Sequence, residues 1–166
     1  VLAALNAIQK LGIKVSLKNN ECKIFGKGID GYKYKKHLKL DAKNSGTLGR
    51  LILGWLVNSP ETIHLIGDKS LSKRDFKRVS DPLSKFGAKL KLRNNNFLPL
   101  TIYGSSNLKP IKYVENKGSA QCKSSVIFAA MRTEGTTMIR AKKSRNHTEL
   151  LCKYLKLPVR VKNNKN

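Results

Sequence analysis

The 166-residue sequence predicts an α/β fold of the α+β type, built from a repeated unit of strand, helix, strand, helix, strand and strand (βαβαββ). Three observations indicate this fold. One segment of the chain matches a later segment, amphipathic stretches pass repeatedly into strands of alternating Lys and aliphatic residues, and Asn-rich turns separate paired strands. Units of this kind must pack against one another to cover their apolar faces.

The internal repeat aligns residues 44–67 with residues 118–141 without a gap. Small residues fall on small ones, as Ser45 does on Ser119, and aliphatic residues fall on aliphatic ones. In each copy a short polar turn leads into an apolar stretch long enough for a helix, and an apolar strand follows. The pattern predicts one helix that begins near Ser45 and an equivalent helix that begins near Ser119.

The second half of each unit also recurs. An amphipathic stretch ends in a small loop and passes into a strand with period-2 alternation, at residues 5–17, 80–92 and 150–162. After the first two of these, an Asn-rich turn leads into a second strand, which indicates a β-hairpin. The predicted second strands are residues 22–26 and 98–104.

The ends of the chain cut through this pattern. Val1 falls inside a predicted helix, and residues 162–166 stop where another hairpin is expected. We therefore expect residues 1–166 to form most of one domain of βαβαββ repeats that is truncated at both ends.

The formal net charge of +24 favours anionic partners. Because Lys and Asn both have A/T-rich codons, part of this charge also fits a low-GC genome. The longest apolar runs are too short to cross a bilayer, and no basic leader with an apolar core opens the chain. We therefore expect a cytoplasmic protein without a membrane partner.

The cysteines and histidines give no metal-binding or disulfide pattern. Cys22, Cys122 and Cys152 are widely spaced and form no CxxC pair, which favours reduced thiols packed as small apolar residues. The three histidines lack metal-ligand spacing, and no Ser-His-Asp arrangement stands out. We expect no metal site.

The candidate binding features are the two polar turns that open the repeated helices, Asn44–Thr47 (the first turn) and Ser119–Gln121 (the second turn). A helix N-terminus presents unpaired backbone N–H groups and the positive end of the helix dipole, so small residues there admit an oxyanion. For each turn taken alone, an ordinary N-cap is the alternative.

A basic loop follows the strand after each repeated helix, and one loop contains Arg74 while the other contains Arg145. A guanidinium group matches phosphate and carboxylate in a bidentate manner. Because equivalent loops should emerge at the same end of repeated units, we expect Arg74 to face the first turn and Arg145 to face the second.

At these residues the sequence resembles the 5-enolpyruvylshikimate-3-phosphate (EPSP) synthase family over essentially its whole length. The matching segments, in family order, are "LDAKNSGTLGRL" (40–51), "GDKSLSKRDFKRVSDPLSKFGA" (67–88), "LPLTIYG" (98–104), "LKPIKY" (108–113), "SAQCKSSVIFAA" (119–130) and "SRNHTE" (144–149). The resemblance implies an enolpyruvyl transferase-like fold of two domains, each an inside-out barrel of three βαβαββ units. The second domain is absent from this chain, which covers well under half of a family member.

The resemblance also implies an activity. The family moves the enolpyruvyl group of phosphoenolpyruvate to the 5-hydroxyl of shikimate 3-phosphate and releases phosphate, with no metal or organic cofactor, in the shikimate pathway to chorismate and the aromatic amino acids. The implied contacts to shikimate 3-phosphate are Ser119, Ala120, Gln121 and Arg145, and those to phosphoenolpyruvate are Gly46 and Arg74. The proton-transfer groups fall in missing segments, so we expect this chain to be inactive alone and the full-length enzyme to be a monomer.

Two alternatives remain open. The sister enzyme that transfers enolpyruvyl to UDP-N-acetylglucosamine has the same fold but carries a reactive cysteine in a mobile loop, and the basic loop at residues 67–76 contains none. A basic nucleic-acid-binding module would need a contiguous cationic face and stacking aromatics. Aromatic residues make up only 7% of the chain and occur singly, so we expect no nucleic-acid partner.

The chain departs from the family pattern at Lys43, where Gly is usual, and at Asn146, where Asp is common. Gly46 is expected to leave open space beside the phosphoenolpyruvate site. Larger residues there are associated in the family with tolerance to glyphosate, the inhibitor of these enzymes.

Overall fold

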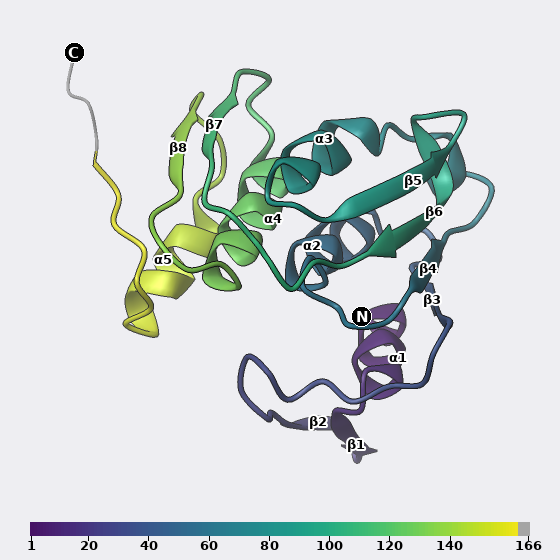
Figure 1. Cartoon of the computed structure of the whole chain (residues 1–166). Coiled ribbons are helices and arrows are strands. Elements are labelled where there is room, and N and C mark those ends of the chain that lie inside the picture. The colour runs from purple at the N-terminus through teal and green to yellow at the C-terminus, as the bar shows by residue number, and fades with distance from the viewer. Residues whose placement is uncertain (163–166) are drawn as a thin grey trace.

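The computed structural model describes residues 1–162 and contains one complete βαβαββ unit (Figure 1). Its elements, in chain order, are β3 (Leu38–Asp41), α2 (Gly46–Trp55), β4 (Ile63–Ile66), the short 3₁₀ helix η1 (Leu71–Lys73), α3 (Lys77–Lys85), β5 (Lys89–Arg93) and β6 (Phe97–Tyr103). The four strands form one sheet in the order β3-β4-β6-β5, with β3 and β4 parallel and the other pairs antiparallel. The predicted unit of strand, helix, strand, helix, strand and strand is confirmed.

Parts of two further units flank the complete one. The elements before it are α1 (Leu2–Lys10), β1 (Lys14–Lys18) and β2 (Glu21–Phe25), and those after it are β7 (Lys112–Glu115), α4 (Ala120–Met131), β8 (Met138–Ala141) and α5 (His147–Tyr154). β1 and β2 form an antiparallel hairpin, whereas β7 and β8 form a parallel pair. Each pair therefore corresponds to one half of the four-stranded sheet.

One predicted strand is wrong. Residues 158–162 alternate Lys or Arg with aliphatic residues but form no strand, and the hairpin expected after them falls partly on residues 163–166, outside the described part of the chain. An isolated strand leaves its backbone N–H and C=O groups unpaired, so this segment needs a partner strand before it can be one.

The hairpin turns follow from asparagine chemistry. Asn19 and Asn20 have φ angles of 49° and 62°, and Asn94 and Asn95 have φ angles of 48° and 56°. Two successive residues with positive φ match the right-handed twist of the flanking strands, and Asn tolerates this left-handed region better than other non-Gly residues. Both predicted hairpins are confirmed.

Helices α2 and α4 pack directly against each other, and this contact joins the complete unit to the one that follows it (Figure 1). A Cβ atom on Gly54 of α2 would overlap the carbonyl of Ser125 on α4. The hydroxyl of Ser125, which is fully buried, donates to the carbonyl of Arg50 at 2.9 Å. A glycine and a hydrogen-bonded serine thus allow the two helix backbones to approach closely.

Several side chains of the apolar elements lie at the margin of the core. Trp55 and Phe128 are half-buried and stack on each other, with ring centroids 5.0 Å apart, at the C-terminal ends of α2 and α4. His64 is half-buried and its Nδ1 lies 2.9 Å from the hydroxyl of Thr101. The expectation that all three cysteines are packed is wrong for Cys22, which is exposed on β2.

Replacing Gly54 with Ala should lower the free energy of unfolding by about 1–3 kcal/mol, because the added methyl group forces the α2 and α4 backbones apart. Chemical denaturation followed by circular dichroism measures the change. Gly26→Ala is the matched control, since a Cβ atom on Gly26 meets no atom within 4 Å. Equal stability of the two variants would contradict the close contact at Gly54.

Candidate functional site

The first turn is an N-terminal cap whose first helical residue has no side chain. Ser45 is the N-cap of α2, and its hydroxyl accepts from the N–H of Leu48 at 3.1 Å. The first helical residue, Gly46, is buried, and no acidic side chain stands in the first helical turn. The positive end of the helix dipole is therefore not neutralised by a carboxylate of its own helix.

The second turn has the same construction at α4. Ser119 is the N-cap, and its hydroxyl accepts from the N–H of Cys122 at 3.3 Å. The opening helical turn of α4 contains no acidic residue either. The ordinary capping role, left open from the sequence, is present at both serines. It uses their hydroxyl groups and leaves the N–H groups of the first two helical residues without intrahelical acceptors.

A hydrogen bond brings the two turns together. The side-chain amide nitrogen of Gln121, at the start of α4, donates to the hydroxyl of Thr47, at the start of α2, at 2.8 Å. The two helix N-termini therefore lie side by side at the same end of the fold, as the repeat predicts. Two anions bound at these turns would therefore lie next to each other within a single binding site.

Arg50 also contacts Gln121, and it was not predicted from the sequence. Its guanidinium donates to the side-chain oxygen of Gln121 at 2.7 Å and to the carbonyl of Asp75 at 3.1 Å, and it lies 5.1 Å from the ring centroid of Phe76. Burial lowers the pKa of Arg50, yet a guanidinium stays charged at physiological pH. The available signal was a single arginine, one helical turn after Gly46, in an otherwise apolar run.

Arg74 faces the first turn. Its Nη2 donates to the side-chain oxygen of Asn44 at 2.9 Å and lies 3.5 Å from the hydroxyl of Ser70. A Cβ atom on Gly46 would lie 3.3 Å from Nη1 of Arg74 and 2.9 Å from Nη1 of Arg50. The expected open space beside Gly46 is therefore wrong, because two guanidinium groups occupy it.

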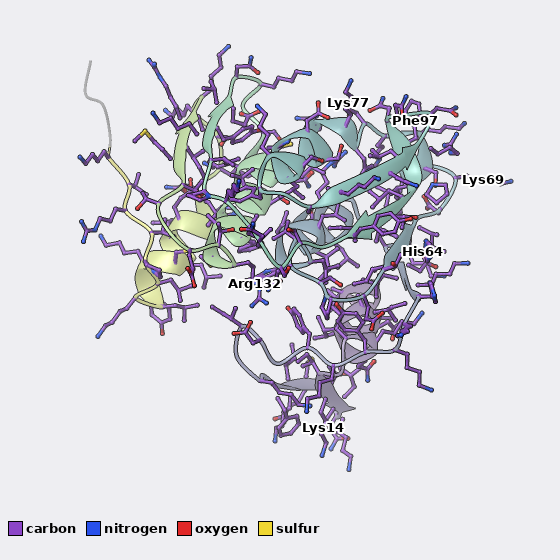
Figure 2. The ribbon with its side chains drawn as sticks, viewed as in Figure 1. Lys14, His64, Lys69, Lys77, Phe97 and Arg132 are labelled. Carbon is purple, nitrogen blue, oxygen red and sulfur yellow. The ribbon has the colours of Figure 1, made fainter. Side chains whose placement is uncertain are left out.

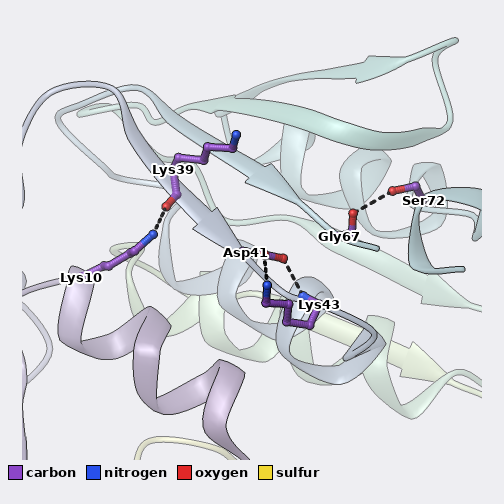
Figure 3. A network of polar contacts seen from close by, with 6 residues as sticks. All are labelled: Lys10, Lys39, Asp41, Lys43, Gly67 and Ser72. Atoms are coloured by element: carbon purple, nitrogen blue, oxygen red, sulfur yellow. Dashed lines mark hydrogen bonds and ion pairs between the residues drawn. The ribbon is translucent and has the colours of Figure 1, made fainter. Parts of the chain in front are cut away.

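The strand that leads into the first turn ends in an ion pair (Figure 3). Asp41 accepts from the backbone N–H of Lys43 at 2.8 Å and pairs with its ammonium group at 2.9 Å. Burial alone would raise the pKa of Asp41, but the hydrogen bonds and the charge of Lys43 outweigh burial and lower it. Lys43 has a φ of 51°, so the position where the family usually has Gly does adopt a left-handed conformation here.

Figure 3 also shows how the next basic loop is anchored, since the hydroxyl of Ser72 donates to the carbonyl of Gly67 at 3.2 Å. The N–H of Asp68 in turn donates to the carbonyl of Lys43 at 2.9 Å. The loop that carries Arg74 is thus held by backbone groups against the first turn, which explains why its guanidinium reaches Asn44.

The loop that carries Arg145 contacts α4 and the second turn through its backbone. The carbonyl of Arg145 accepts from the ammonium group of Lys123 at 3.1 Å, and the carbonyl of Lys143 would lie 3.5 Å from a Cβ atom on Gly118. Arg145 is exposed, and its guanidinium makes no hydrogen bond within residues 1–162. The loop therefore lies at the second turn, and the role of the guanidinium there stays a prediction.

Other side chains hold that loop on α4. Lys123, which is 8% exposed, forms an ion pair with Glu149, and the hydroxyls of Ser124 and Thr148 lie 2.7 Å apart. Within the described part of the chain, the buried hydroxyl of Ser144 has no partner. Ser144 adjoins Arg145 and was not among the residues singled out from the sequence. In the sequence, the one feature that pointed to Ser144 was its position next to Arg145.

Basic side chains are not confined to these turns. In Figure 2 the labelled Lys14, Lys69 and Lys77 extend from three different sides of the molecule.

None of the helices within residues 1–162 is long and apolar enough to cross a membrane.

Comparison with known proteins identifies the family to which the chain is similar. The family model for EPSP synthase (3-phosphoshikimate 1-carboxyvinyltransferase) matches residues 1–166. The 3-phosphoshikimate 1-carboxyvinyltransferase of Streptococcus mutans is 44% identical over 155 residues, which cover 92% of this chain and 36% of the relative. That of Bacillus subtilis is 43% identical over 150 residues, covering 89% of this chain and 35% of the relative. The chain thus spans about a third of the length of these relatives.

The solved structures agree as well. An EPSP synthase from Acinetobacter baumannii superimposes with a TM-score of 0.90 at 33% identity, covering 98% of this chain and 37% of the other. The predicted enolpyruvyl transferase-like fold is therefore confirmed. The names of these relatives support the first of the two enolpyruvyl transferases considered from the sequence over the sister enzyme that acts on UDP-N-acetylglucosamine.

Proposed function

This chain belongs to the EPSP synthase family, and on that premise we propose that it forms the part of an EPSP synthase that binds both substrates. The complete enzyme transfers the enolpyruvyl group of phosphoenolpyruvate to the 5-hydroxyl of shikimate 3-phosphate and releases phosphate. The observation that carries the proposal is the hydrogen bond between Gln121 and Thr47, which holds two helix N-termini side by side. A transfer between two phosphorylated molecules needs two adjacent anion sites of this kind.

Phosphoenolpyruvate is assigned to the first turn. Gly46 offers backbone without a side chain, and Arg74 stands beside it with its guanidinium already oriented by Asn44. The buried guanidinium of Arg50 adds a second positive charge within about one turn of helix. Two fixed cations suit a ligand with both a carboxylate and a phosphate group, and their preorganisation reduces the cost of binding.

Shikimate 3-phosphate is assigned to the second turn, with Ser119, Ala120 and Gln121 at the start of α4 and Arg145 in the adjacent loop. The N–H groups of Ala120 and Gln121 are donors for its phosphate. The exposed guanidinium of Arg145 has no competing partner within residues 1–162, so it is available to fold onto the ligand. The side chain of Arg145 would then become ordered when the ligand binds, whereas that of Arg74 is already held by Asn44.

The rest of the enzyme is also part of the proposal. Residues 1–166 form most of one repeat domain, and segments outside them complete the β1–β2 and β7–β8 sheets, supply a second domain and carry the proton-transfer groups. The reaction uses no metal or organic cofactor. The full-length enzyme is a cytoplasmic monomer that binds small molecules and no nucleic acid.

Two arginine variants of the full-length protein that contains this segment test the assignments. Arg74→Ala should raise KM for phosphoenolpyruvate at least about tenfold, and Arg145→Ala should do the same for shikimate 3-phosphate, because a charge-assisted hydrogen bond contributes about 1.5–3 kcal/mol. Phosphate release under varied concentrations of each substrate measures both constants.

Lys73→Ala and Lys143→Ala are the matched controls, since each removes an exposed positive charge one or two residues before one of the arginines. Loss of affinity for the same substrate in both arginine variants would overturn the assignment of one substrate to each turn. Binding of DNA or RNA that survives both arginine substitutions, with a steep dependence on salt, would favour the nucleic-acid-binding alternative.

The isolated 166-residue chain should release no phosphate from the two substrates, because the groups that move protons are assigned to other segments. The same assay at high protein concentration, with the full-length protein as the positive control, measures this. Turnover above the buffer background would contradict the assignment.

Gly46→Ala should reduce inhibition by glyphosate, which occupies the phosphoenolpyruvate site in this family, and should also raise KM for phosphoenolpyruvate. The new methyl group would stand 2.9 Å from Arg50 and 3.3 Å from Arg74, so both guanidinium groups must shift. The ratio of the inhibition constant to KM separates the two effects. An unchanged inhibition constant would contradict the proximity of the inhibitor to Gly46.

A further inference from the structure

The second turn is closed by a buried carboxylate. Glu115 is the last residue of β7 and is only 4% exposed. Its Oε2 accepts from the backbone N–H of Ser119 at 2.8 Å, and its Oε1 accepts from the backbone N–H of Lys117 at 3.2 Å. Both oxygens of this carboxylate therefore accept hydrogen bonds from the chain segment that leads into α4.

The first turn shares one of these two bonds, since Asp41 accepts from the N–H of Lys43 as Glu115 does from that of Lys117, but it differs in the other. There the N–H of Ser45 donates to the backbone carbonyl of Ala42 at 2.8 Å, three residues earlier. Ser119 lies four residues after Glu115, and its N–H goes to the carboxylate instead. The capping serine of each helix is thus tied back to the end of the preceding strand, by a backbone group in one repeat and by Glu115 in the other.

The second turn borders a cavity of about 220 Å³, lined in part by Arg78, Tyr113, Glu115 and Cys122. A carboxylate buried beside such a space is tolerated because its oxygens are hydrogen-bonded, and its charge is a stronger acceptor than a neutral amide would be. The two backbone bonds of Glu115 therefore join the end of β7 directly to the segment that leads into Ser119.

We propose that Glu115 is a positioning residue for shikimate 3-phosphate: by accepting from Ser119 and Lys117, it sets the N-terminus of α4 where the phosphate binds. This inference rests on the proposed function, since it concerns the same site. Glu115 does not touch the substrate. Its bond to Ser119 leaves the next two N–H groups, those of Ala120 and Gln121, directed to the ligand.

Glu115→Gln in the full-length protein is the first test. The amide keeps the size of the side chain but presents an NH2 group to one of the two backbone donors, so one bond is lost. We expect KM and the calorimetric Kd for shikimate 3-phosphate to rise about tenfold, while KM for phosphoenolpyruvate and kcat change less than about twofold. A role confined to overall stability would instead lower the amount of active protein and leave KM for both substrates unchanged.

Glu61→Gln is the matched control, because it removes one negative charge from a half-buried position in the turn between α2 and β4. It should leave both substrate constants as they are. A loss of affinity for shikimate 3-phosphate equal to that of Glu115→Gln would overturn the proposal, since the effect would then come from charge alone.

A second variant rebuilds the turn without the carboxylate. Residues 115–118 (Glu-Asn-Lys-Gly) are replaced by Ala-Ala-Lys-Asn, whose last three residues are those at 42–44, so that the N–H of Ser119 can reach the backbone carbonyl of residue 116, three residues earlier. Affinity for shikimate 3-phosphate within about threefold of the parent supports turn closure as the role of Glu115. Affinity no better than that of Glu115→Gln overturns it.

The parent protein separates this inference from the proposed function. A full-length parent that fails to bind shikimate 3-phosphate contradicts the proposed function. A parent that binds, together with a Glu115→Gln variant that binds equally well, contradicts only the role of Glu115.

Discussion

The close contact between α2 and α4 is the constraint on which the candidate site depends. Gly54 and Ser125 let the two backbones approach, and Ser125 bonds to the carbonyl of Arg50. Because the helices run side by side from this contact, their N-termini meet, and Gln121 can reach Thr47. The polar site at one end therefore follows from the choice of small residues inside an apolar interface.

Much of the fold was accessible from the sequence because the chain repeats itself and its Asn-rich turns are local signals. The repeated unit was predicted from the match of residues 44–67 to 118–141, and the two hairpins and the capping serines were predicted from patterns within a few residues. The strand over residues 158–162 failed because its pairing depends on a neighbour that the described chain lacks. Periodicity reveals which faces a segment could bury, not whether a partner is present.

The site itself was only partly predictable. Arg74 was found because its loop recurs at a constant offset, and the orientation of its guanidinium then followed from bonds to Asn44. Arg50 was missed because its role depends on a residue 71 positions away, Gln121, which no local pattern reveals. Glu115 was missed because the two turns looked equivalent in sequence, and only the hydrogen bonds show that the N–H of the capping serine goes to a side chain at Ser119 and to a backbone carbonyl at Ser45.

Gln121 has a further consequence for how the two halves of the site communicate. Its oxygen is engaged by Arg50 and its nitrogen by Thr47, so the amide cannot rotate without disturbing both. A ligand at the second turn that forms a hydrogen bond with Gln121 and moves its side chain must also change the surroundings of the Thr47 hydroxyl at the first turn. Binding at either turn then alters the affinity of the other turn for its ligand, and thermodynamic linkage requires the two affinities to change by the same factor.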